Sequence, residues 1–176
     1  NVEIGEHWDI VREEAMIPDT LADLLIARVD RLADQTKETV QTAAILGQEF
    51  EICLLSTMLQ SLQEGFTPAE IQTCVQAGVE ERIWIMLAEP TYVFAHSLLR
   101  DAVYQMQLRS RLRRLHRAAA QAISQLHPDD PRLYSDLAFH CENAEIMDEA
   151  ISHYHQAGDY AQDTYAVALA ISYYQK

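Results

Sequence analysis

The sequence predicts a mainly α-helical fold that contains a single β-hairpin. Apolar residues recur at three- and four-residue spacing through most of the 176 residues, which is the period of helices with one buried face. Two short β-prone runs, 83–87 and 92–94, interrupt this period, and a turn-forming segment separates them. The composition, with 49% hydrophobic and 23% charged residues and only five glycines and five prolines, is that of a globular domain.

Start and stop signals divide the first half of the chain into short helices. Pro18 disfavours helix at the residue before it, so residues 1–17 are predicted to be a linker. Three helices are expected next, from Asp19 to Leu32 with an apolar stripe at Leu21, Leu24, Leu25, Arg28 and Leu32, from an Asp34 cap to Gly47, and from Ile52 to Leu62. The clearest signal is Thr67-Pro68-Ala69-Glu70, a capping box with proline at the first helical position. It predicts a helix from Pro68 to about Arg82.

Several helices followed by one hairpin are the layout of a winged helix, in which the hairpin is the wing. Residues 18–107 are therefore predicted to form a winged-helix-like domain. Ser97 is expected to cap a helix that runs through Leu108, and residues 108–131 are predicted to be a connecting helix that ends at the proline-containing break 127–131.

Residues 132–176 are predicted to begin an array of tetratricopeptide-like α-α repeats. The residues that match the offsets of such a unit are Tyr134, Leu137, Ala138, Cys141, Ala150, Tyr154 and Ala157. A partial echo follows, since the motif at 150–154 returns at 170–174. We expect the matching residues to be buried between antiparallel helices, and the apolar face of residues 166–174 to bind a protein partner or a second copy.

Charge and motif content exclude several classes of function. The formal net charge is −14, which argues against nucleic acid or an anionic membrane as partner of the whole surface. No apolar run approaches the length of a membrane span, and neither a glycine-rich phosphate loop nor a Gly-x-Ser-x-Gly elbow occurs. Neither an autonomous nucleotide hydrolase nor a serine hydrolase is therefore expected.

Cysteine usage and the amino terminus bear on the origin of the chain. Cys53, Cys74 and Cys141 are odd in number and widely spaced, which favours buried thiols in the cytoplasm over disulfides. The chain starts at Asn1 without a signal-peptide pattern. We therefore expect a segment of a longer cytoplasmic protein.

Soft and imidazole ligands occur in one region, at His140, Cys141, His153 and His155. His153 and His155 are two residues apart, so on a helix they point to different sides. Surface histidines and a core cysteine are the preferred interpretation, and no metal site is predicted.

Basic residues concentrate in one stretch of this acidic chain, at Arg100, Arg109, Arg111, Arg113, Arg114 and Arg117. The stretch 97–117 carries a local charge of +5, which leaves −19 elsewhere. Clustered arginines on a helix beside a winged helix can contact phosphates. We favour the alternative that they face the acidic remainder of the protein or another domain of it.

The segment Tyr92-Val93-Phe94-Ala95-His96-Ser97 ends a predicted strand and begins a predicted helix. A donor at such a junction can reach phosphate oxygens, because a helix N-terminus already favours anions. A histidine that only caps or packs is the simpler interpretation of these residues taken alone.

Three blocks of the sequence together resemble a known family. They are Ile17 to Leu32, Ala43 to Phe50, and Phe94-Ala95-His96-Ser97-Leu98-Leu99-Arg100-Asp101-Ala102-Val103-Tyr104. The chain resembles the STAND signal-transduction ATPases, in the form attached to bacterial adenylate and guanylate cyclases and to maltose-regulator-like transcription activators.

The resemblance implies an ATP-binding core upstream, a winged helix that acts as an intramolecular regulator, and a repeat array downstream. Relatives carry a Met-His-Asp triplet whose histidine contacts the β-phosphate of bound ADP. Ala95-His96-Ser97 takes that place here, so the histidine is kept and the acidic residue is not. His96 is thereby implied to sense an ADP phosphate in the intact protein.

We therefore expect a non-catalytic regulatory segment that couples the nucleotide state of the upstream core to an output domain, a cyclase or a transcription regulator. ATP and ADP are expected as ligands of the longer protein and none for the segment itself. The alternatives are a DNA-binding winged helix with a dimerising helical tail and a peptide-binding tetratricopeptide adaptor.

Overall fold

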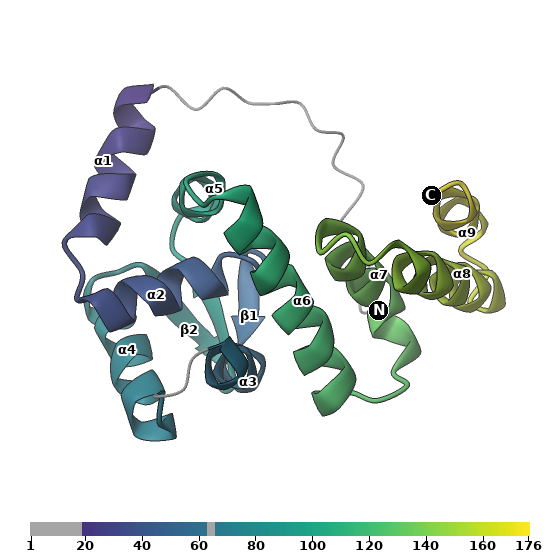
Figure 1. The fold of residues 1–176 in the computed structure, drawn as a ribbon, viewed down its shortest axis with the longest axis horizontal. Coiled ribbons are helices and arrows are strands. Elements are labelled where there is room, and N and C mark those ends of the chain that lie inside the picture. The colour runs from purple at the N-terminus through teal and green to yellow at the C-terminus, as the bar shows by residue number, and fades with distance from the viewer. Residues whose placement is uncertain (1–18, 63–65) are drawn as a thin grey trace.

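The fold is mainly helical with one small antiparallel sheet, as the sequence predicts (Figure 1). The structure is a computed structural model that describes residues 19–62 and 66–176, with side chains from Leu24 onward. The predicted linker 1–17 and the side chain of Leu21 lie outside this part.

The first half of the chain arranges four helices and the sheet. The helices are α1 (Asp19–Asp30), α2 (Asp34–Ala43), α3 (Ile52–Leu62) and α4 (Pro68–Glu80), and the strands are β1 (Glu49–Glu51), β2 (Trp84–Ala88) and β3 (Thr91–Phe94). The predicted hairpin is confirmed, with Trp84 opposite Phe94 and Ile85 opposite Val93. The expectation of a single strand pair is wrong, because β1 pairs with β3 and makes the strand order β1-β3-β2. The winged-helix assignment stays a prediction, which this element order supports.

An aromatic cluster forms the centre of the first core. Trp84 is fully buried and meets Phe50 and Phe94 edge to face, at ring-centroid distances of 5.3 and 5.7 Å. Its indole Nε1 donates to the carbonyl of Val75 on α4 at 2.9 Å, so the one polar atom of the ring is satisfied. The sheet is thereby fixed against α4.

The second half of the chain is helical, and its longest helix joins the sheet-bearing part to the last three helices. It contains α5 (Ser97–Gln105), α6 (Arg109–Leu126), a 3-10 turn (Pro131–Leu133), α7 (Tyr134–Asn143), α8 (Met147–Asp163) and α9 (Val167–Tyr174). Figure 1 shows α6 between the sheet-bearing part and the helices α7 to α9. Leu115 and Ala119 of α6 pack with Met58 of α3, whereas Ala120 and Ile123 pack with Leu137 of α7. The predicted connector therefore contributes to the cores on both of its sides.

Burial in α7 and α8 follows the repeat pattern with one exception. Six of the matching residues are buried, namely Leu137, Ala138, Cys141, Ala150, Tyr154 and Ala157. Tyr134 is only half-buried, because it starts α7 at the edge of the helix pair. On the following helix, Val167 and Ile171 are exposed and only Ala170 is buried.

The structure confirms one of the helix caps predicted from the sequence and contradicts two others. The capping box at Thr67 is formed in full, with both hydrogen bonds to Glu70. Asp34 and Ser97 were expected to be caps, but each is the first helical residue, and neither Ala33 nor His96 before it makes a side-chain cap hydrogen bond. The helix from Ser97 ends at Gln105 rather than Leu108, which is exposed.

Two expectations of burial are wrong. Leu24 is 69% exposed, because α1 turns Leu25 and Val29 toward the core instead. Cys53 is exposed at the start of α3, whereas Cys74 and Cys141 are buried as expected. Among the described residues, no helix has the length and apolar character that crossing a membrane requires.

Candidate regulatory interface

His96 lies where β3 gives way to α5. Its backbone is extended, with φ −141° and ψ 124°, and its carbonyl accepts the amides of Leu99 and Arg100 in the first turn of the helix. The side chain is exposed and forms no hydrogen bond or ion pair within the part of the chain that the structure describes. The imidazole is therefore exposed beside a helix N-terminus, where an anion is favoured.

The arginines of α6 divide into those with carboxylate partners and those without. Glu145, in the turn between α7 and α8, pairs with Arg109 at 3.0 Å and with Arg113 at 2.9 Å. Arg111 pairs with Glu38 of α2 at 2.8 Å and donates from Nε to Gln107 at 3.0 Å. Three of the five predicted interaction residues thus bind acids of the same chain, as the favoured interpretation expects.

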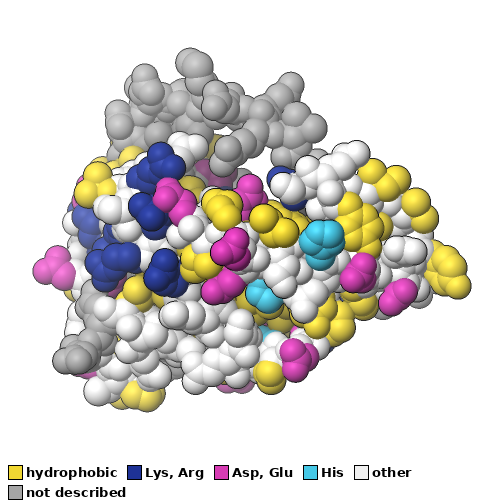
Figure 2. Space-filling view, turned by 45° about the vertical axis from the view of Figure 1, so that its right-hand side comes forward, with side chains coloured by type: hydrophobic (Ala, Val, Ile, Leu, Met, Phe, Trp, Pro, Cys, Tyr) yellow, Lys and Arg dark blue, Asp and Glu magenta, His cyan; other side chains and the backbone are white. Residues whose placement is uncertain are grey.

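Arg114 and Arg117 are exposed, and neither forms an ion pair with any residue between 19 and 62 or between 66 and 176. The structure therefore leaves two of the α6 arginines available to a partner. Figure 2 shows a face of the molecule on which basic side chains gather beside acidic ones. No hydrogen bond or ion pair joins His96 to these arginines within the described residues.

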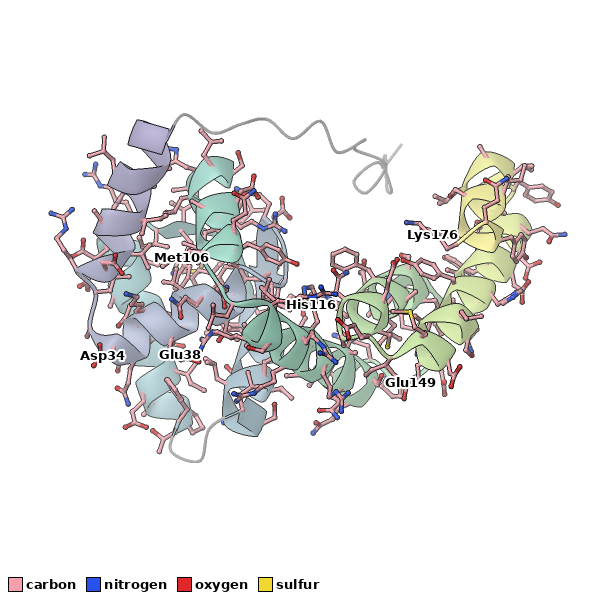
Figure 3. The ribbon with its side chains drawn as sticks, turned by 45° about the horizontal axis from the view of Figure 1, so that its top comes forward. Asp34, Glu38, Met106, His116, Glu149 and Lys176 are labelled. Carbon is pink, nitrogen blue, oxygen red and sulfur yellow. The ribbon has the colours of Figure 1, made fainter. Side chains whose placement is uncertain are left out.

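A buried polar chain links α5, α6 and α7. His116 is fully buried, and its Nε2 lies 2.9 Å from the hydroxyl of Tyr104. Its Nδ1 lies 2.9 Å from Nδ1 of His140, which is 5% exposed. Figure 3 shows His116 where α6 faces α7. These hydrogen bonds cross the junction between the sheet-bearing part and the helices that begin with α7.

Both histidines of this pair are held neutral. Burial lowers the pKa of His116 to about 4, and the nearby charge of Arg100 adds to the effect. Burial also lowers the pKa of His140, with His116 contributing. Only one hydrogen fits between the two Nδ1 atoms, so one ring donates and the other accepts.

The burial of His116 is indicated by the spacing of its apolar neighbours on α6. Leu112, Leu115, His116 and Ala119 follow the helical spacing of a buried face, which places His116 inside. His140 was expected on the surface and is buried instead, because α7 turns the adjacent His140 and Cys141 both toward its neighbours.

The four candidate metal-binding residues do not form a site together. His155 is exposed, while His153 stacks on Tyr134 and contacts Gln156. No group of three or more His, Cys, Asp or Glu side chains is arranged to hold a metal ion in the described part of the chain.

Comparison with known proteins gives one distant relative. No protein-family model matches the chain. An uncharacterized protein of Rhizobium meliloti (strain 1021) is 26% identical over 136 residues. The match covers 77% of this chain and 13% of that protein, so the chain spans about an eighth of the length of the relative.

Proposed function

We propose that this chain is a non-catalytic regulatory segment of a larger, cytoplasmic, ATP-dependent signalling protein. In this proposal the sheet-bearing domain docks on an upstream ATPase core and passes its nucleotide state to an output domain. The helical repeats supply a surface for a protein partner. The match to about an eighth of a longer protein supports a role within a larger chain.

The outer surface of α4 and the hairpin carries this proposal. A winged helix that reads DNA needs cations on the helix and wing that approach the phosphates. Here α4 contains no Lys or Arg, and its exposed polar residues are Gln72, Thr73, Gln76 and Glu80. The wing strand exposes Ile85, Met86 and Leu87 at 52%, 54% and 61%. A polar-to-acidic helix beside an apolar strand suits contact with a protein domain.

A DNA-binding winged helix is the second candidate, because Arg114 and Arg117 have no acidic partner among the described residues. We expect the 176-residue chain to show no sequence-specific duplex binding, since only two unpaired arginines are exposed on α6. Fluorescence anisotropy with duplex DNA at 50 and 200 mM salt measures this. Tight binding that falls steeply with salt would instead support the DNA-binding candidate.

His96→Ala tests the proposed link to the ATPase core in the full-length protein. The exposed imidazole is proposed to donate to a phosphate of ADP held by that core. Losing one charge-assisted contact costs about 1.5–3 kcal/mol, so ADP should dissociate at least about tenfold faster. Release of a fluorescent ADP analogue measures the rate.

His155→Ala is the matched control, because His155 is also exposed but lies on α8. Circular dichroism should show both variants folded. Equal ADP release in wild type and His96→Ala would contradict the proposed sensor role.

A further inference from the structure

A groove of about 530 Å³ lies between α6 and α8, and of His96 and the α6 arginines described above Arg117 alone lines it. Its floor is formed by buried Ala120 and Cys141, with Ile146 from the turn before α8. One wall belongs to α6 and the other to α8. The groove therefore has an apolar floor between two helical walls.

The α6 wall is a row of polar groups without partners. Its side chains are Arg117, Gln121, Ser124 and Gln125, and all four are exposed. None of them makes a side-chain hydrogen bond or ion pair with residues 19–62 or 66–176. Arg113, one turn before Arg117 in the same row, has its charge matched by Glu145. Arg117 is thus the first arginine of the row whose charge is available.

The α8 wall carries the opposite charge. Glu149 lines it together with His153, and Glu149 accepts only a long contact of 3.9 Å from the thiol of Cys141. Arg117 and Glu149 line the same groove but form no ion pair with each other. Opposite charges therefore stand on opposite walls, and each lacks a counter-ion among the described residues.

We propose that this groove binds an extended polypeptide segment in which an acidic and a basic residue are adjacent. Successive side chains of an extended chain point to opposite sides, so the carboxylate meets Arg117 while its neighbour meets Glu149. The amides of Gln121 and Gln125 each offer donors and an acceptor to the main chain of the segment. A helix would leave these amides without partners, because its own backbone groups are already bonded.

The opposite charges on the two walls also argue against a nucleic acid as the ligand of the groove. Glu149 would repel a phosphate backbone along the wall that faces Arg117. The inference rests on the proposed role of the repeats as an interaction surface, and it names that surface. It does not depend on His96 or on ADP, so failure of the ADP experiment leaves it standing.

Selection from a displayed library of random twelve-residue peptides on the 176-residue chain tests the proposal. Enriched peptides should contain an acidic residue next to a basic one. Fluorescein-labelled copies should bind Arg117→Glu at least about tenfold more weakly than wild type. Arg114→Glu, the same charge change one turn away and outside the groove, should lower affinity by less than about threefold, because exposed charges are screened.

Exchanging the charges of the two walls distinguishes weaker binding caused by lost charge pairing from weaker binding caused by misfolding. The double variant Arg117→Glu with Glu149→Arg should prefer peptides in which the order of the two charges is reversed. Enrichment of no peptide, enrichment of peptides without the charge pair, or equal losses in Arg117→Glu and Arg114→Glu would each overturn the proposal.

Discussion

Gly78→Ala should lower the free energy of unfolding by about 3 kcal/mol, through overpacking and loss of one buried hydrogen bond. A Cβ at Gly78 would lie 2.7 Å from Nε1 of Trp84 and closer still to two carbons of the indole. The ring has no room to retreat, because it is fully buried between Phe50 and Phe94. Moving it would also break the bond to the carbonyl of Val75. Urea denaturation followed by tryptophan fluorescence measures the loss.

Gly158→Ala is the matched control for this prediction. A Cβ there would also crowd a ring, with Cζ of Tyr174 at 2.8 Å. Tyr174 is 42% exposed on α9 and can swing aside. Replacing a helical glycine by alanine gains up to about 1 kcal/mol of helix propensity, so Gly158→Ala should change stability by less than about 1 kcal/mol. A loss at Gly158 as large as that at Gly78 would contradict the argument from packing.

Elements fixed by neighbouring residues were predictable from the sequence. The Thr67 capping box needs only residues three apart, and the hairpin needs two β-prone runs beside a turn. β1 was missed because it has only three residues and owes its existence to pairing with β3, about forty residues later. The face of α1 was misassigned for a related reason, since only the packing of α1 on the core decides that Val29 is buried and Leu24 exposed.

Those features of the candidate site that depend on residues close together in the sequence could be predicted. The position of His96 between a strand and a helix follows from sequence pattern alone. The acidic partners of the arginines could not be predicted from the sequence pattern. Glu145 and Glu38 are distant from these arginines in sequence and reach α6 only through the tertiary fold. The groove beside Arg117 also needs α7 and α8 in place, so no sequence motif marks it.

The Tyr104–His116–His140 chain makes stability depend on pH. The folded-state pKa of His116 is about 4, below the unfolded value of 6.5, so the unfolded chain binds a proton more readily. Stability is therefore full above pH 6.5 and falls as the pH drops from 6.5 toward 4. A difference of about 2.5 pKa units corresponds to roughly 3 kcal/mol. His140 acts in the same direction, because burial lowers its pKa too.

Asp136 opposes this effect within an overlapping range. Burial raises its folded-state pKa to about 6, above its ordinary value of 3.8. Its protonated form is favoured in the fold, so stability rises as the pH falls from 6 toward 3.8. The contribution of the histidine pair must therefore be measured as a difference between variants.

The double variant His116→Leu with His140→Leu should remove the histidine contribution while Asp136 and the surface carboxylates remain. Wild type should lose at least about 2.5 kcal/mol relative to this variant between pH 7 and pH 4.5, because unfolding exposes imidazoles that bind protons only in wild type. His116 alone accounts for about that much over this range, and His140 adds to it. Urea denaturation at each pH gives the two curves, and His155→Leu controls for removal of an exposed histidine. Parallel curves for wild type and the double variant would contradict burial of a neutral pair. A variant curve that rises on acidification would show the remaining effect of Asp136.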